Sequence, residues 1–483
     1  MYIGIDLGTS GVKVILMDET GKVVASETAG LQVSRPQPLW SEQQPEDWWQ
    51  ATDAAMKLLA KGQDLSPVKA IGLSGQMHGA TLLDKQHKVL RPAILWNDGR
   101  SFEACKTLQL QCPEVQSITG NLVMPGFTAP KLLWLKEHEP SVYQQVDKVL
   151  LPKDYLRFRI TGEFATDVSD ASGTLWLDMQ SRGWSDRMLA ATGLDKTHMP
   201  KVLEGCQVSG YLDPQLAKSW SLSCVPVVAG GGDNAAGAVG MGVIKEGQTM
   251  MSLGTSGVIF SVGDGFSANP ASALHSFGHA LPNTWHTMSV ILSAASCIDW
   301  VVKLSGFASV SAAFEALQTS GKETTNVVFL PYLSGERTPH NNPNAKGVFW
   351  GMDHQTTGLD LLQAVLEGVS FALLDGLDAV RSVQEVSEQI DVIGGGARSA
   401  YWLQLLADVF AITMDYREGG EVGPSLGAAR LAAIGVQGEA AINSICYRPG
   451  LIQSFVPNPQ RSAYLLAQRE RYLSLYQGVK GIL

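Results

Sequence analysis

The hexapeptide Leu-Gly-Thr-Ser-Gly-Val occurs twice in this chain of 483 residues, at residues 7–12 and again at residues 253–258. Each copy lies between runs of apolar and β-branched residues, so each is predicted to form a strand, a tight turn and a second strand. Such a turn presents backbone N–H groups and hydroxyls to an anion. One copy alone is also typical of an ordinary hairpin. Two identical copies, one in each half, suggest related domains that face each other across a shared phosphate.

Asp6 ends the strand that leads into the first turn, and Lys13 follows that turn. A carboxylate beside a turn rich in N–H donors suits a Mg²⁺ ion, bound directly or through water. The alternative is that Asp6 caps the turn and Lys13 is a solvent-facing strand residue. The spacing favours the functional interpretation for Asp6 and the structural one for Lys13.

Asp233 is the second carboxylate at the end of an apolar strand, and it follows a run of three glycines. An aspartate at this place can be the N-cap of the small-residue helix that follows, or a general base that accepts a proton from a hydroxyl. The spacing alone does not decide between these two roles. The glycines at 394–396 have a similar double meaning, as a tight strand-to-helix turn or as a place where a purine and ribose lie against bare backbone.

The histidines offer a weaker case for a metal site. His275 and His279 lie four residues apart, with His286 close behind, and this spacing binds zinc only on a helix. Pro282 and Asn283 instead predict a hairpin here, whose neighbouring side chains point to alternate faces. His78 differs, because it follows a predicted strand in a Gly-flanked loop and is expected to face a cleft.

Strands alternate with helices along the whole chain, which predicts the α/β class. The stretch 163–178 is expected to be loop and short strand. A strand turning into a helix is predicted over 149–162. Strands are predicted at 68–73, 225–228 and 389–393, and helices at 46–60, 101–111, 129–138, 360–380, 400–410 and 423–434.

The composition limits the class of protein. The chain carries 36 basic and 46 acidic residues, for a net charge of −10, with no basic run that would indicate a nucleic-acid partner. Its six cysteines are scattered, as in a reduced protein, and no apolar run has the length of a membrane span. We therefore expect a cytoplasmic protein with neither a nucleic-acid nor a membrane partner.

Several longer segments together resemble the FGGY family of carbohydrate kinases, over the whole chain. Two are typical of that family: Gly-Phe-Thr-Ala-Pro-Lys-Leu-Leu-Trp at 126–134, and Gly-Val-Phe-Trp-Gly-Met at 347–352, which continues to 364–367. Others are similar to the members that act on D-xylulose: Ser-Gly-Gln-Met-His-Gly at 74–79, and the segments 95–100, 151–155 and 231–237. No walker-type phosphate loop is present in the sequence.

The resemblance implies two ribonuclease-H-like (actin-like ATPase) domains that flank a catalytic cleft, over residues 1–240 and 241–483. The first would bind the sugar and the second the nucleotide. It implies transfer of the γ-phosphate of ATP to the 5-hydroxyl of D-xylulose, with Mg²⁺ as cofactor, in a protein that is typically a homodimer.

The resemblance also implies roles for particular residues. Asp233 would be the general base, and Asp6 would support catalysis by binding Mg²⁺. The sugar would contact Met77, His78, Asp233, Asn234, Trp96 and Asp98. The phosphates would lie at Gly8, Thr9, Gly254 and Thr255, and the nucleotide at Gly395, Gly396 and Arg398.

Three other interpretations remain. The nearest is a kinase of the same family for another ketose or polyol, such as ribulose, gluconate or glycerol. An actin-like ATPase that drives a conformational change would need no sugar loop around His78. A sugar-sensing regulator on the same fold would be expected to have lost Asp6 or Asp233, and both are present.

Overall fold

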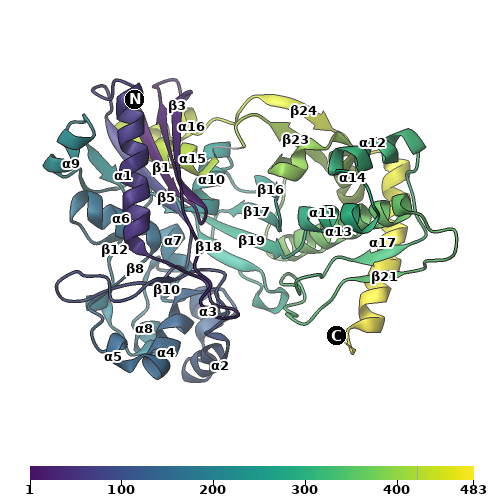
Figure 1. The fold of residues 1–483 in the computed structure, drawn as a ribbon, viewed down its shortest axis with the longest axis horizontal. Coiled ribbons are helices and arrows are strands. Elements are labelled where there is room, and N and C mark those ends of the chain that lie inside the picture. The colour runs from purple at the N-terminus through teal and green to yellow at the C-terminus, as the bar shows by residue number, and fades with distance from the viewer. Residues whose placement is uncertain (421–422, 483) are drawn as a thin grey trace.

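The computed structural model describes residues 1–420 and 423–482. The chain forms two lobes that lie side by side (Figure 1), each built around a seven-stranded sheet. Among the described residues, no helix is long and apolar enough to cross a membrane.

The sheet of the first lobe has the strand order β13-β14-β5-β1-β2-β3, with a short strand β15 that also pairs with β5. The strands β1, β2 and β3 are antiparallel neighbours, whereas β5 lies parallel to β1 and to β14. The edge strand β13 is again antiparallel. These strands span Tyr2–Leu7 (β1), Gly11–Met17 (β2), Val23–Gly30 (β3), Ala70–Gly75 (β5), Val208–Tyr211 (β13), Pro226–Val228 (β14) and Gly231–Gly232 (β15).

The second sheet repeats this pattern of pairings in the order β18-β19-β17-β16-β22-β23-β24. The pairs β16–β17 and β17–β19 are antiparallel, β16–β22 and β22–β23 are parallel, and β23–β24 is antiparallel. The repeated topology confirms the predicted pair of ribonuclease-H-like α/β domains. The strands are Thr249–Leu253 (β16), Gly257–Gly263 (β17), His275–Gly278 (β18), Trp285–Ile291 (β19), Gln389–Ile393 (β22), Thr413–Arg417 (β23) and Leu451–Phe455 (β24).

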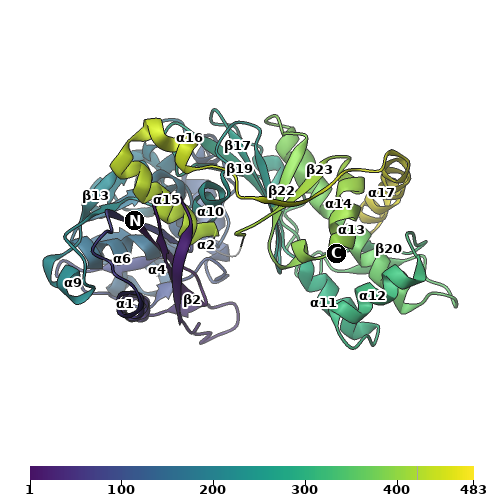
Figure 2. The ribbon, with the colours of Figure 1, turned by 90° about the horizontal axis from the view of Figure 1, so that it is seen from above.

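Helices cover both faces of the first sheet. Helix α1 (Pro45–Gly62) packs against β2 and β3, while α15 (Gly423–Gln437) packs against β1, β5 and α10 (Asp233–Met241). Figure 2 shows α1 and α15 on opposite sides of this lobe. The core of the second lobe forms around α13 (Gly358–Arg381), whose residues from Leu362 to Val380 are nearly all buried.

Helix α15 belongs to the second half of the sequence but lies on the first lobe (Figures 1 and 2). Glycines permit this close packing, because a Cβ on Gly4 would lie 1.9 Å from the carbonyl oxygen of Ser425, and one on Gly72 would lie 1.9 Å from that of Ala428. The chain then returns to the second lobe for β24 and the last helix, α17 (Pro459–Val479). The division into two domains after residue 240 remains a prediction. In the structure, α15 follows this boundary in the sequence but packs on the first lobe.

The predicted elements agree closely with the structure. Helix α14 (Ala400–Phe410) and strand β22 have the predicted bounds, and α1, α13 and α15 begin within two residues of theirs. The stretch 163–178 was incompletely predicted, because it also contains helix α7 (Val168–Ser172). This single turn is nucleated by the Asp167 side chain, which accepts hydrogen bonds from the N–H groups of Ser169 and Asp170.

Candidate functional site

The strand pairing brings the two candidate carboxylates to one edge of the first sheet. Ser74 on β5 is the register partner of Asp6 on β1 and also of Gly231 on β15. Because these strands are parallel, their carboxyl ends meet at the same edge. Asp233 comes directly after β15 as the first residue of α10. The two strand ends therefore place Asp6 and Asp233 close enough to interact electrostatically.

Burial raises the pKa of Asp233 to about 7, and the negative charge of Asp6 adds to this rise. Asn234 opposes this rise in the pKa, because its backbone N–H and its side-chain Nδ2 donate hydrogen bonds to Asp233 Oδ1 over 2.7 and 2.9 Å. A carboxylate whose pKa lies near neutrality is well matched to accept a proton from a hydroxyl. The geometry thus allows the general-base role that spacing alone left open.

Asp6 has the properties of a cation ligand. Its Oδ1 is buried and has no hydrogen-bond partner among the described residues. Burial raises the pKa of Asp6 to about 6, and the Ser74 side chain and then the charge of Lys13, its partner in the hairpin register, work in the opposite direction. A hard divalent cation prefers such a carboxylate oxygen and keeps several waters. The described residues hold no cluster of three or more acidic, histidine or cysteine side chains that would form a complete metal cage.

The first hexapeptide turn is bonded to the surrounding first lobe. Gly8 N–H donates to the Gly11 carbonyl over 2.9 Å and closes the turn. Thr9 Oγ1 donates to Gln76 Oε1 over 3.0 Å and accepts a hydrogen bond of 3.1 Å from Trp96 Nε1. Trp96 is 45% exposed, so its ring is available at the surface of the site.

The second turn lines a cavity of about 690 Å³ in the second lobe. Gly254 and Thr255 form part of its wall, together with the predicted nucleotide residues Gly395, Gly396 and Arg398. A Cβ on Gly395 would meet open space, so this backbone is bare toward the surroundings. The structure therefore brings the three residues predicted at the nucleotide together with the two predicted phosphate residues of the second turn, whereas Gly8 and Thr9 do not line this cavity.

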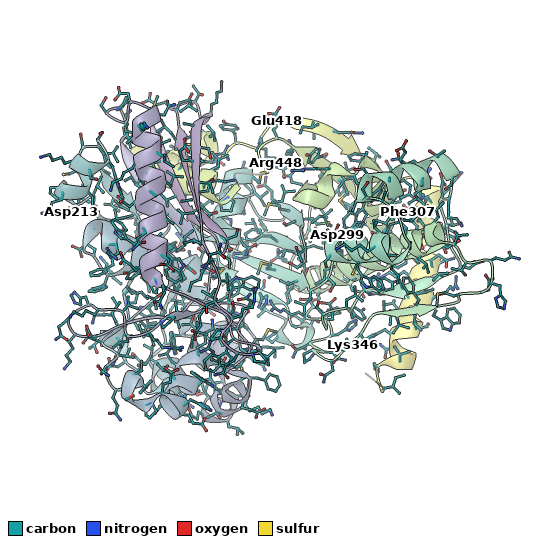
Figure 3. The ribbon with its side chains drawn as sticks, viewed as in Figure 1. Asp213, Asp299, Phe307, Lys346, Glu418 and Arg448 are labelled. Carbon is teal, nitrogen blue, oxygen red and sulfur yellow. The ribbon has the colours of Figure 1, made fainter. Side chains whose placement is uncertain are left out.

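The opposite wall of this cavity was not predicted. It comes from α11 (Ala295–Leu304) and α12 (Val310–Ser320), which contribute Asp299, Phe314 and Gln318. Figure 3 labels Asp299 on the second lobe. In the sequence these helices show only an ordinary amphipathic pattern, and the glycine-rich turns that they face are distant along the chain.

The loop that carries His78 is fixed by the family segment 126–134. His78 has a positive φ of 67°, and its carbonyl oxygen accepts hydrogen bonds from Thr128 Oγ1 over 3.1 Å and from Lys131 Nζ over 2.9 Å. Its ring Nδ1 lies 2.6 Å from the Gly173 carbonyl oxygen. Burial lowers the pKa of His78 to about 3, so the imidazole is neutral at physiological pH.

Met77 connects this loop to the carboxylate edge. An ideal Cβ on Gly232 would lie 3.0 Å from Met77 Cγ, so Met77 packs against the residue just before Asp233. Met77, His78, Asp233 and Asn234 therefore surround one region of the first lobe.

Asp98 is placed differently from the other predicted sugar residues. Its carboxylate is buried, accepts the N–H of Ser41 over 2.6 Å and is paired with Arg100 over 2.6 Å. The Arg100 guanidinium in turn lies over the ring of Trp40, 3.6 Å from its centroid. These contacts stabilise the loop that presents Trp96, and a direct sugar contact by Asp98 stays a prediction.

The three clustered histidines pack among aromatic rings. His275 stacks on Phe277 with centroids 5.4 Å apart, and His286 stacks on Phe260 at 4.1 Å. Burial lowers the pKa of His275, His279 and His286 below its ordinary value, so these imidazoles are neutral. His275 lies on β18 and His286 on β19, and these two strands pair antiparallel, as the hairpin prediction required.

Comparison with known proteins identifies the family. The N-terminal domain of the FGGY family of carbohydrate kinases matches residues 1–240, and its C-terminal domain matches residues 249–436. The chain is 58% identical to a xylulose kinase of Escherichia coli, with 99% of each chain covered, and 57% identical to one of Klebsiella pneumoniae, with both chains covered completely. The crystal structure of a xyloylose kinase from Brucella ovis is 44% identical in sequence and superimposes over the full length of both chains with a TM-score of 0.95. The chain belongs to the FGGY family of carbohydrate kinases.

Proposed function

We propose that this protein phosphorylates D-xylulose on its 5-hydroxyl, with ATP as the phosphoryl donor. The observation that carries the proposal is the position of Asp233, a buried carboxylate with a pKa of about 7 at the strand edge that it shares with Asp6, beside the loop of Met77 and His78. The choice of sugar is supported by the two bacterial relatives that are named xylulose kinases.

In this mechanism Asp233 accepts the proton of the 5-hydroxyl as that oxygen forms a bond to the γ-phosphorus of ATP. The bond between the γ-phosphorus and the bridging oxygen breaks, and ADP leaves with the electron pair. The proton stays on the Asp233 carboxylate until solvent removes it. Phosphoryl transfer asks little covalent chemistry of a protein, so positioning and charge neutralisation supply most of the rate.

The two hexapeptide turns would position the phosphates from opposite lobes. We assign Gly8 and Thr9 to one side of the phosphate chain and Gly254 and Thr255 to the other, with the purine and ribose at Gly395, Gly396 and Arg398. When bound, Mg²⁺ neutralises charge on the phosphate oxygens. Asp6 would hold the ion, because its Oδ1 is buried and lacks a hydrogen-bond partner among the described residues.

The sugar would lie on the first lobe, between Asp233 and the loop of Met77 and His78. Asn234 and Trp96 would complete the contacts, Asn234 beside the carboxylate and Trp96 through its exposed ring. A homodimer remains part of the proposal, and sedimentation of the full-length protein would test it.

The first experiment is ADP release with Mg·ATP and a panel of D-xylulose, D-ribulose, L-ribulose, D-gluconate, glycerol and no sugar. Preference for D-xylulose, with slow ATP hydrolysis in its absence, is expected. Preference for another sugar would keep the mechanism and replace the substrate. Equal activity without sugar would contradict a sugar kinase and favour an actin-like ATPase.

The base is tested by Asp233→Asn, which keeps the size of the side chain and removes its basicity. It should lower kcat by at least roughly 10²-fold while D-xylulose affinity changes by less than about tenfold. Retention of normal turnover would exclude Asp233 as the base.

A further inference from the structure

Arg337 of the second lobe lies beside the His78 loop of the first. It belongs to the segment between β20 (Val328–Leu330) and β21 (Val348–Trp350). Its Nη1 lies 3.3 Å from Nε2 of His275, and the other ring nitrogen of that histidine lies 3.2 Å from Asn121 Oδ1 in the first lobe. The guanidinium is therefore at a junction between the lobes.

A continuous series of contacts links this junction to the proposed sugar site. The rings of His78 and His275 both pack edge-on against Phe127, with centroids 5.0 and 5.6 Å away. The positive charge of Arg337 also reinforces the effect of burial in lowering the pKa of both histidines. The series begins at Met77, which packs against Gly232, the residue before Asp233. It continues through His78, the next residue in the chain, and ends at Arg337.

The Arg337 guanidinium forms no ion pair with a carboxylate of the described residues. Within the described parts of the chain, no carboxylate oxygen lies within 4.0 Å of its guanidinium nitrogens. Its neighbour Glu336 does not pair with the guanidinium: Glu336 Oε1 accepts the backbone N–H of Arg337 over 2.7 Å, and the Glu336 charge only partly offsets the effect of burial on the pKa of Arg337. Burial lowers the pKa of Arg337 itself.

Two other arginines at least partly removed from water are ion-paired, and Arg430, which is fully buried, donates to the carbonyl oxygens of Val239, Gly240 and Tyr447 instead. Arg469, on α17 in the same lobe, is paired with Asp375 and with Asp378, and Arg100 in the first lobe is paired with Asp98 and with Glu42. Taking a cation out of water without a partner is costly. The unpaired guanidinium thus has N–H donors that are available for oxygen atoms brought by a ligand.

We propose that Arg337 binds the ketone end of the sugar, donating hydrogen bonds to the oxygens on C1 and C2. This inference rests on the proposed function, in which the 5-hydroxyl lies at Asp233, so the opposite end of a five-carbon chain points along the series of contacts toward Arg337. The sugar is then held by both lobes: the first lobe positions the reacting hydroxyl, and the second recognises the ketone.

The test compares Arg337→Met with Arg337→Lys and with the control Arg469→Met. Arg337→Met should raise the KM for D-xylulose roughly tenfold to hundredfold, the range for hydrogen bonds to a charged group, and leave the KM for ATP within about twofold. Arg337→Lys should give a smaller rise. Arg469→Met removes a partly buried arginine that is paired within its own lobe, so it should lower Tm and leave the sugar KM unchanged.

Selectivity provides a second readout that a merely structural role would not change. Xylitol and D-arabinitol, the two products of reducing D-xylulose at C2, lack the ketone. The wild-type protein should prefer D-xylulose to either pentitol, and Arg337→Met should lose most of this preference. Sugar binding without ATP, followed by tryptophan fluorescence, gives the same comparison for any variant that is folded but slow.

The two proposals fail in different ways. If wild-type protein does not phosphorylate D-xylulose, the proposed function fails, and the same variants measured on whichever panel sugar is turned over still decide whether Arg337 binds it. If wild type is active but Arg337→Met and Arg337→Lys keep both the normal KM and the preference for the ketose, Arg337 does not contact the sugar.

Discussion

The two copies of the hexapeptide have the same sequence but fold into different hairpins. In the first lobe, Leu7 pairs with Val12 across a turn closed by the Gly8–Gly11 hydrogen bond. In the second lobe, Leu253 pairs with Gly257, and the turn is one residue shorter. A shift of one residue moves side chains to the opposite face of a sheet. Val12 is accordingly buried, whereas its counterpart Val258 is half-buried.

The surroundings of each turn explain the difference. In the second lobe the N–H of Ala294 donates to the Thr255 carbonyl over 2.8 Å, which anchors the turn to the start of α11. Gly257 faces the core there, where a Cβ would lie 2.7 Å from Leu373 and 2.8 Å from Ile291. In the first lobe the turn is bonded to side chains of the sugar side instead. Tertiary contacts, and not the six residues, choose the register.

The largest effect is expected at the residue that precedes each copy, Asp6 in the first and Ser252 in the second. Asp6→Asn should lower kcat by roughly 10²-fold or more, because the carboxylate proposed to hold Mg²⁺ is lost. Ser252→Ala should change kcat by less than about threefold. Turnover at saturating ATP, repeated over a Mg²⁺ titration, checks both. Equal losses in the two variants would show that the turns are catalytically equivalent.

The register difference itself can be tested by removing the same side chain from both copies. Val12→Ala should cost about 2 kcal/mol of unfolding free energy, because it leaves a cavity in a closed core. Val258→Ala should cost less than about 1 kcal/mol, since its side chain is already half-buried. Urea denaturation measures the two values. Similar losses at both positions would contradict the shifted register.

A pH profile isolates the carboxylate pair of the first lobe. Protonated Asp233 cannot accept a proton, so kcat/KM should fall as the pH is lowered through about 7. The charge of Asp6 contributes to that raised pKa, so Asp6→Asn should move the fall in activity to lower pH. An unchanged midpoint in Asp6→Asn would mean that the two carboxylates are not coupled.

The smallest expected effects separate the substrates. Thr9→Val removes a proposed phosphate contact and also the acceptor of Trp96 Nε1, so it should raise the KM for ATP and for D-xylulose. Thr255→Val alters only the wall of the nucleotide cavity and should raise the KM for ATP alone. Each change should be roughly threefold to tenfold, the range for one hydrogen bond. Steady-state kinetics with either substrate varied gives both values. An unchanged KM for D-xylulose in Thr9→Val would contradict a link between the first turn and the sugar, and an unchanged KM for ATP in either variant would contradict its phosphate contact.

Local pattern was sufficient to predict most of the fold. The apolar periodicity of α13 and the strand-to-helix turn before α14 depend on neighbouring residues, so their bounds followed from the sequence. The position of Asp233 at a strand end was predicted in the same way. The short helix α7 was missed because it is a single turn, held by a side-chain cap and not by an apolar stripe.

The parts of the site that were not predicted depend on distant contacts. Phe314 and Arg337 carry no local motif, and each reaches its place only when the second lobe has folded. Asp98 was predicted beside the sugar from its segment alone, and its ion pair with Arg100 is visible only in three dimensions. The register of the second hairpin could not be predicted for the same reason, because it is decided by distant contacts with Leu373 and with the start of α11.

The return of α15 to the first lobe has a consequence for biosynthesis. The face of the first sheet formed by β1 and β5 is covered by α15, whose residues, Gly423–Gln437, are translated long after both strands. Domains generally fold as units while the chain emerges from the ribosome. Here the sheet face made by β1 and β5 stays uncovered until α15 has been synthesised, more than 340 residues after β5. An apolar face of the nascent chain is therefore exposed to aggregation throughout the synthesis of the residues between β5 and α15.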